Sequence, residues 1–181
     1  MSADESEGMP QAMSYYAGID PGQAGAIVLL DATSRIAEIM DWPPGEAESG
    51  ILAIHEWLRY GPLLDRLEYA VIERGQVRPA REGERGQGVV SAYTFGVRVG
   101  EWRGLIVGLR TRLEMVAPQS WQAAILKGQP KTAKVKDRAW LYACQRWGID
   151  RFSGPRGAKL YGRSDAACMA ELARRRCGSG A

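Results

Sequence analysis

Apolar residues in the first part of the chain come in short runs that turn-forming residues separate. The runs at about 15–20, 25–31 and 34–41 are typical of β-strands, and a Pro-Gly pair separates the first two. Because short connections join strands that run in opposite directions, these runs predict an antiparallel meander. Residues 1–13 are polar and acidic, and we expect them to form a disordered tail.

The rest of the chain alternates between helical patterns and two more apolar strands. Helices are predicted at about 49–60, 89–109, 132–147 and 165–176, a short helix from Pro118, and strands at about 68–73 and 113–117. Ser164 can cap the last helix, which would then begin with Asp165. A meander followed by alternating strands and helices predicts an α/β domain with a mixed sheet of about five strands. We expect this domain to cover residues 14–176, followed by a tail over 177–181.

Composition places the chain among ordinary globular proteins, with 181 residues, 45% hydrophobic and 25% charged. The net charge of +3 does not by itself indicate nucleic-acid binding, but cations gather locally, and a local cluster sets the local potential. Four arginines lie in one Gly-rich stretch and four lysines in a second stretch: Arg74, Arg78, Arg81, Arg85, Lys127, Lys131, Lys134 and Lys136. These stretches could grip phosphates, and the alternative is a solvated surface.

Several classes of protein are excluded by what the chain contains. Three cysteines without CxxC spacing and a single histidine favour neither a disulfide framework nor a zinc site. No apolar run is long enough to cross a bilayer, and the acidic first residues are unlike a secretory signal. We therefore expect a cytoplasmic protein that has no membrane partner.

Three acidic residues stand in apolar surroundings, where an unpaired carboxylate is costly. Asp20 ends the first strand and Glu73 ends the strand at 68–73. Asp165 precedes Cys168 and Met169 by three and four residues, which places it on the apolar face of the last helix. In the plainer interpretation, Asp20 only opens a turn and Asp165 only complements a helix dipole.

If the strands that carry Asp20 and Glu73 are neighbours, the three carboxylates meet at one edge of the sheet. Three anions at close range repel one another, so they would persist only with cations between them. Oxygen ligands favour Mg²⁺, and Mn²⁺ can substitute for it. Two such ions about 4 Å apart would activate a water and stabilise the leaving oxygen of a phosphodiester.

Five motifs follow one another in the chain. They are Gly18-Ile19-Asp20-Pro21-Gly22 with Gly25-Ala26, Val71-Ile72-Glu73, Ala117-Pro118-Gln119-Ser120-Trp121, Lys136-Asp137-Arg138-Ala139 and Gly162-Arg163-Ser164-Asp165-Ala166-Ala167. In this order and spacing the chain resembles the RuvC-type Holliday junction resolvases, most closely the RuvC-like proteins of bacteriophages, over about 15–173. The resemblance implies an RNase H-like fold and a homodimer that cuts symmetric strands of a four-way DNA junction, in the cytosol of a phage-infected or bacterial host.

The resemblance also implies roles for individual residues. It makes Asp20, Glu73 and Asp165 ligands of two Mg²⁺ ions, and it gives Lys136 the task of stabilising charge on the phosphate. Lys134 could replace Lys136 in that task, and the alternative for Lys136 is a solvated lysine at a helix start. The expected DNA-binding residues are Arg74, Arg78, Arg81, Arg85, Lys131 and Lys134.

The chain departs from the family pattern at two places. Gly162 stands where the family has a fourth metal-site residue, and no aromatic wedge follows Glu73. A second hypothesis is therefore a branched-DNA-binding protein with weak nuclease activity, or with activity broadened to forks and flaps. A third interprets Asp20-Pro21-Gly22 as a phosphate-binding loop of an actin-like ATPase, but such enzymes need two lobes. The small residues of the helix at 89–109 make it the expected dimer surface.

Overall fold

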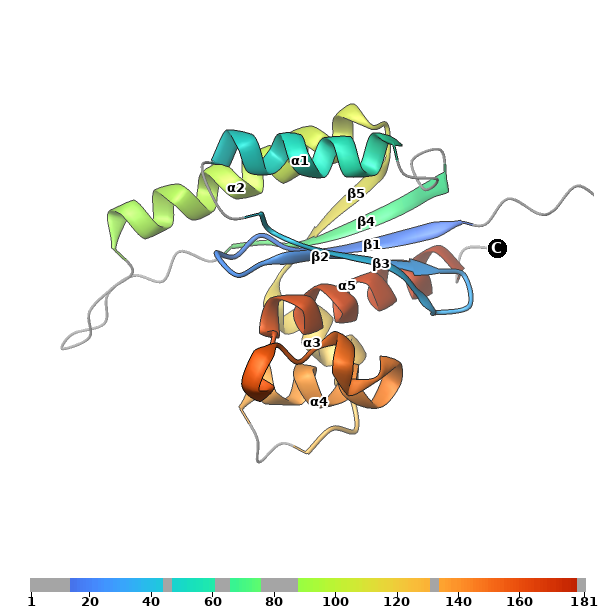
Figure 1. Ribbon diagram of the computed structural model, residues 1–181. Helices are drawn as coiled ribbons and strands as arrows, with labels where there is room; N and C mark the ends of the chain where they lie inside the picture. The colour runs from blue at the N-terminus through green and yellow to red at the C-terminus, as the bar shows by residue number, and fades with distance from the viewer. Residues whose placement is uncertain (1–13, 44–46, 61–65, 76–87, 131–133, 179–181) are drawn as a thin grey trace, which may run out of the picture.

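A central β-sheet organises the molecule (Figure 1). The computed structural model describes residues 14–43, 47–60, 66–75, 88–130 and 134–178. The strands are β1 (Tyr15–Asp20), β2 (Ala26–Asp31), β3 (Ile36–Asp41), β4 (Leu67–Glu73) and β5 (Arg112–Val116), in the sheet order β3-β2-β1-β4-β5. The pairs β1–β2 and β2–β3 are antiparallel, whereas β1–β4 and β4–β5 are parallel. The predicted five-stranded mixed sheet is confirmed.

Helices cover both faces of this sheet (Figure 1). One face carries α1 (Ala47–Tyr60) and α2 (Val89–Gly108), and the other carries α3 (Pro118–Ile125), α4 (Val135–Trp147) and α5 (Tyr161–Gly178). Short 3₁₀ turns, η2 (Ile149–Arg151) and η3 (Pro155–Gly157), join α4 to α5. Among the described residues, no helix combines the length and apolarity that a membrane crossing requires.

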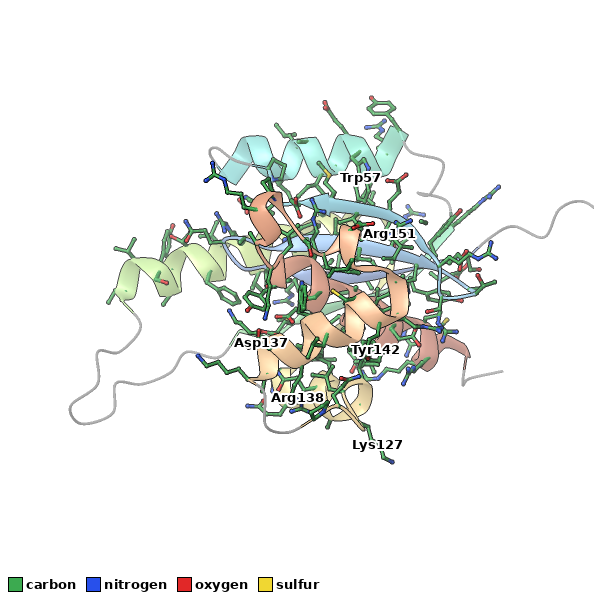
Figure 2. The ribbon with its side chains drawn as sticks, turned by 60° about the horizontal axis from the view of Figure 1, so that its bottom comes forward. Trp57, Lys127, Asp137, Arg138, Tyr142 and Arg151 are labelled. Atoms are coloured by element: carbon green, nitrogen blue, oxygen red, sulfur yellow. The ribbon has the colours of Figure 1, made fainter. Side chains whose placement is uncertain are left out.

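Alternating side chains of β1 divide the core into layers. Ile19 packs with Trp102 and Ile106 of α2, whereas Tyr16 packs with Trp121 of α3 and with residues of α5. This is the period of two that a strand buried on both faces requires. On the second face, the guanidinium of Arg138 in α4 donates to the Leu126 carbonyl at 3.2 Å, which ties α4 to the end of α3 (Figure 2).

Helix α5 lies directly against β1 because Gly18 has no side chain. A Cβ atom at Gly18 would lie 2.0 Å from the Ala166 carbonyl oxygen and 2.2 Å from the Ala170 nitrogen. Any other residue there would push α5 away from the strand. The close approach brings the first half of α5 to the edge of the sheet where β1 ends.

The start of α5 corrects the prediction that Ser164 caps this helix. The helix begins at Tyr161, one turn earlier, and the Ser164 hydroxyl donates to the Tyr161 carbonyl at 2.8 Å inside that first turn. Asp165 therefore lies in the second turn rather than at the first helical residue. The prediction was wrong because the first turn contains Gly162 and polar residues, so the apolar period becomes visible only from Ala166 onward.

Candidate active site

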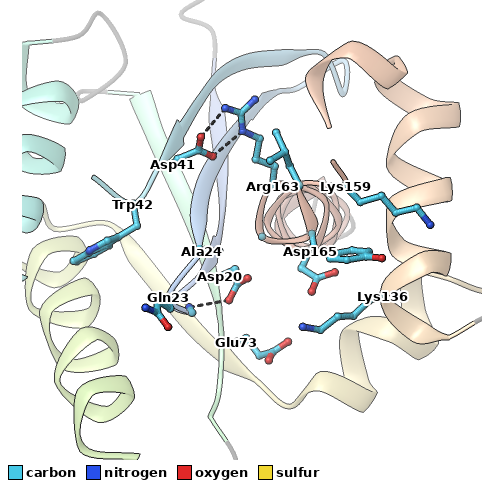
Figure 3. A pocket seen from close by; sticks show the side chains of 15 residues that line it. Asp20, Gln23, Ala24, Asp41, Trp42, Glu73, Lys136, Lys159, Arg163 and Asp165 are labelled. Atoms are coloured by element: carbon cyan, nitrogen blue, oxygen red, sulfur yellow. Dashed lines mark hydrogen bonds and ion pairs between the residues drawn. The ribbon is translucent and has the colours of Figure 1, made fainter. Parts of the chain in front are cut away.

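A cavity of about 590 Å³ opens at the edge of the sheet where β1 and β4 end (Figure 3). Because β1 and β4 are adjacent and parallel, their last residues, Asp20 and Glu73, reach the same edge. Asp165 of α5 and Lys136 of α4 line the same cavity. The structure thus brings together the four residues that the sequence assigned to catalysis, while their roles stay predictions.

Backbone contacts of the β1–β2 turn (residues 21–25) fix Asp20. The Gly22 amide donates to Asp20 Oδ1 at 2.9 Å (Figure 3). The guanidinium of Arg98 in α2 donates in turn to the Gly22 carbonyl at 3.1 Å and lies over the Trp42 ring, 5.2 Å from its centroid. Arg98 therefore supports, through the turn, the carboxylate that the turn orients. Arg98 was not predicted from the sequence, because no local motif marks it.

A buried indole holds Glu73. Trp121 is 1% exposed, and its Nε1 donates to Glu73 Oε2 at 2.8 Å. A buried tryptophan needs an acceptor for its N–H, so this bond satisfies the indole and orients the carboxylate together. The sequence contained the motif around Trp121, but only the fold shows which acceptor its ring reaches.

Crowding of carboxylates in a partly buried cavity raises their pKa values. Burial raises the pKa of Asp165 to about 8, helped by the charges of Asp20 and Glu73 and opposed by Lys136. Burial also raises the pKa of Asp20, which the Gly22 hydrogen bond opposes, and the pKa of Glu73, which the Trp121 bond opposes. In addition, Asp165 Oδ1 is buried without a hydrogen-bond partner. Negative charge at this site is thus poorly compensated by the chain itself.

The donor set and the geometry give different answers about a cation. Three carboxylates supply only oxygen ligands, which suit hard divalent ions such as Mg²⁺. The unpartnered Asp165 Oδ1 is a free ligand atom of that kind. In the arrangement of the described residues, however, no group of three or more His, Cys, Asp or Glu side chains could hold a metal ion. The chemistry of the cavity therefore fits a divalent cation, but the side chains would have to draw together around it.

Gly162 also lines the cavity and contributes no ligand. A Cβ atom there would lie 1.9 Å from the Ala24 carbonyl oxygen and 3.0 Å from Gly25 Cα. The first turn of α5 therefore packs against the β1–β2 turn with no room for a side chain. This packing gives a steric reason for glycine at position 162.

Two ion pairs border the cavity and were not predicted from the sequence. Arg163 binds Asp41 of β3 through two contacts of 2.7 and 2.6 Å (Figure 3). Lys159 binds Asp137 at 2.6 Å. Arg163 lay inside a quoted motif, but Asp41 is 122 residues away in the chain, so only the fold reveals the pairing. Both basic residues of these pairs line the cavity.

Lys136 has no carboxylate contact among its described interactions and lies over the Tyr161 ring, 5.9 Å from its centroid. The Tyr161 hydroxyl donates to Asp137 Oδ1 at 2.9 Å, so the ring is held in place. The ammonium of Lys136 points into the cavity toward Glu73 and Asp165 (Figure 3). This cation moderates the repulsion among the carboxylates, since its charge opposes the rise in the pKa of all three.

The predicted DNA-binding residues have different outcomes. Arg74 follows β4 as an exposed residue, and Lys134 is exposed at the N-cap of α4. Neither lines the cavity itself. The remaining predicted residues lie outside the described residues: Arg78, Arg81, Arg85 and Lys131.

Solved structures with a similar fold include two of RuvC. One is RuvC from Thermus thermophilus in complex with Holliday junction substrate, with 16% sequence identity, a TM-score of 0.57, and 92% of this chain and 96% of that chain covered. The other is a Thermus thermophilus RuvC structure with 20% identity, a TM-score of 0.53, and coverage of 91% and 96%. No protein-family model and no curated protein matches the chain. The similarity confirms the RuvC-like, RNase H-like fold that the motifs suggested.

Proposed function

We propose that this protein is a metal-dependent DNA endonuclease that resolves four-way junctions as a homodimer. The observation that carries the proposal is the meeting of Asp20, Glu73 and Asp165, from three separate elements, in one cavity beside Lys136. The likeness in fold to a RuvC solved with a Holliday junction substrate supports the choice of DNA as substrate. Such a substrate would place the activity in the cytosol of a bacterial or phage-infected cell.

In this proposal Asp20, Glu73 and Asp165 hold two Mg²⁺ ions, which Mn²⁺ can replace. Bound divalent ions would supply an activated water and stabilise the leaving oxygen of the phosphodiester. The Gly22 amide and the Trp121 indole keep two of the carboxylates oriented. Lys136 would approach the scissile phosphate and stabilise the charge that develops on it.

The proposed homodimer would use the outward face of α2. Val89, Tyr93 and Val107 are 86%, 73% and 62% exposed, although apolar side chains of this size are usually buried. The helix glycines have no atom within 4 Å of an added Cβ, which leaves their surface open: Gly96, Gly100, Gly104 and Gly108. A four-way junction offers two symmetry-related strands, and a two-fold dimer would offer two matching sites.

The proposed DNA contacts come from cations around the cavity. Arg74 and Lys134 lie on the described surface, and the stretches that contain Arg78, Arg81, Arg85 and Lys131 border them in the sequence. Phosphate contacts of this kind make affinity fall steeply as salt rises.

The test compares cleavage and binding for wild type and Asp20→Asn with a synthetic four-way junction, a fork, a flap and plain duplex in Mg²⁺. We expect wild type to cut the four-way junction symmetrically, and Asp20→Asn to bind it with unchanged affinity without cutting it. Asp150→Asn, at an exposed carboxylate in η2, is the matched control and should cut normally. Full cleavage by Asp20→Asn would refute the assignment.

A second candidate is a branched-DNA-binding protein with weak nuclease activity, or with activity broadened to forks and flaps. Two observations favour it, the closed position at Gly162 and the lack of a preformed metal-binding group among the described residues. The same panel separates the candidates, because strong cutting of the four-way junction alone supports the resolvase. Tight binding with slow or indiscriminate cutting supports the second candidate.

A further inference from the structure

A second cavity, of about 520 Å³, opens between the β1–β2 turn and the N-terminal half of α2. Gln23 lines both this cavity and the cavity that Asp20, Glu73 and Asp165 line, which we call the carboxylate cavity. The two cavities therefore meet at the turn. Figure 3 shows Gln23 on the side of Asp20 that faces away from Lys136. We call the second cavity the α2 groove, and its walls include Gln23, Val90, Ser91, Thr94, Phe95 and Arg98.

Three of the α2 residues that line the groove suit an anion. They supply the hydroxyls of Ser91 and Thr94 and the guanidinium of Arg98. A guanidinium has five N–H donors, of which the Gly22 carbonyl takes one, and Arg98 Nε is buried without a partner. Of the described residues that line the groove, Arg98 alone is ionised and none is a carboxylate. A phosphate is the anion that such a set of donors binds well.

Two other α2 residues that line the groove, Val90 and Phe95, suit a flat apolar group. Val90 is 79% exposed, which is costly for a valine that none of the described residues covers. The Phe95 ring sits over Gly75, where a Cβ atom would lie 2.0 Å from Phe95 Cε1, so the ring is fixed beside the end of β4. Any of the four nucleobases can stack on an aromatic ring, since every base has a π-face.

The geometry points to the α2 groove as the binding site for the nucleotide that flanks the cleaved phosphate. Its phosphate would bind Ser91, Thr94 and Arg98, and its base would pack on Val90 and Phe95. The volume lies within the range that small-ligand sites occupy. A base cannot enter such a groove while it is stacked in a duplex. The substrate is therefore DNA whose backbone exposes an unstacked nucleotide at the cut, as a branch point does.

This inference rests on the proposed function for its choice of ligand. Two substitutions of opposite charge at one position test it separately. Thr94 is exposed, so both Thr94→Glu and Thr94→Lys should fold. Gln145→Glu, on the exposed face of α4, is the control for an added negative charge. Affinity for a fluorescent four-way junction is measured by anisotropy with Ca²⁺ in place of Mg²⁺, after a gel has shown that the DNA stays intact.

We expect Thr94→Glu to bind the junction about 10-fold more weakly, because its charge faces a phosphate. Thr94→Lys should bind as tightly as wild type or more tightly, and Gln145→Glu should change the affinity less than about 2-fold. If Thr94→Glu behaves like Gln145→Glu, or if both Thr94 variants weaken binding equally, no phosphate lies in the groove.

A second measurement tests the base contact. 2-Aminopurine is placed in turn at each position beside the branch point, and its fluorescence is read on binding. We expect one position to respond to wild type, and Phe95→Leu to reduce that response while Gln145→Glu retains it. A response that Phe95→Leu leaves unchanged at every position would overturn the base contact. Because neither measurement needs cleavage, a protein that binds but does not cut would refute the proposed function and still decide this one.

Discussion

Helix α5 carries two carboxylates six residues apart, the half-buried Asp165 and the buried Glu171, and their surroundings are opposite. Asp165 has an Oδ1 without a partner, and burial together with the charges of Asp20 and Glu73 raises its pKa to about 8. Glu171 is 1% exposed and accepts hydrogen bonds from Arg174, Arg175 and Ser34. Burial raises the pKa of Glu171 as well, but these bonds outweigh burial and lower it to about 2.

The contrast separates a carboxylate that supports the fold from one that the fold leaves uncompensated. Glu171 ties α5 to the β2–β3 turn, where Ser34 has a φ of 67° and its carbonyl accepts the Trp147 indole N–H at 2.8 Å. Asp165 has no such role and faces the carboxylate cavity. A poorly compensated carboxylate in a cavity is a candidate functional group, because stability alone would favour its removal.

The largest expected difference between substitutions at Asp165 and Glu171 is in the rate of cleavage. Asp165→Asn should lower the single-turnover rate of junction cleavage by about 1,000-fold or more, which corresponds to about 4 kcal/mol of barrier. Glu171→Gln should retain the rate within about 3-fold for the folded protein, because Glu171 lies outside the cavity. The two rates are measured in one time course, with the folded fraction checked by circular dichroism. Equal losses in both variants would remove the distinction between the two carboxylates.

The next effect is on stability, and here Glu171 rather than Asp165 is the residue whose substitution should be costly. Glu171→Gln should lower the free energy of unfolding at pH 7 by on the order of 3 kcal/mol, measured by urea denaturation. Because the folded pKa lies below the unfolded one, the stabilisation is complete above pH 4.5 and is lost as pH falls toward 2. The difference between wild type and Glu171→Gln should therefore shrink across that acidic range. A difference that stays constant from pH 7 to pH 2 would mean that packing, not charge, sets it.

A stability effect of the opposite sign is expected for Asp165 in the absence of divalent ions. Its folded pKa lies above the unfolded value of 3.8, so the unfolded chain releases this proton first as pH rises. Wild type should lose stability relative to Asp165→Asn as pH rises from 4 to 8, because only the folded chain must hold this carboxyl in its unfavourable charged form. Urea denaturation in EDTA at several pH values measures the difference. If Asp165→Asn is less stable than wild type at pH 8, Asp165 is compensated in a way that its contacts do not reveal.

The smallest effect concerns the residue that supports Asp20 through the β1–β2 turn. Arg98→Lys removes the planar guanidinium that bonds the Gly22 carbonyl and stacks on Trp42. The Mg²⁺ concentration for half-maximal cleavage should rise about 5-fold to 10-fold, with a change in unfolding free energy of about 1 kcal/mol or less. Lys127→Arg, at an exposed position after α3, serves as the control for exchanging the two cations. An unchanged Mg²⁺ requirement would show that the turn holds Asp20 without Arg98.

Local pattern was enough to predict the sheet and the meeting of the acids. The short apolar runs predicted β1 to β3, and two acids at the ends of apolar strands predicted a shared edge once those strands paired. Contacts between distant segments could not be predicted in this way. The Trp121–Glu73 bond depends on where α3 packs against β4, and the Arg163–Asp41 pair depends on where α5 crosses β3. These contacts have no local signal, because the fold alone brings their partners together.

The most direct test of the central claim is thermal unfolding of wild type, Asp165→Asn and Glu171→Gln across a Mn²⁺ titration without DNA. A cation that binds only the folded state raises the unfolding midpoint as its concentration rises. The account predicts a rise for wild type and for Glu171→Gln, each from its own starting value, and no rise for Asp165→Asn. The same rise in all three proteins, or none in wild type, would contradict the claim that these carboxylates form a site for divalent ions.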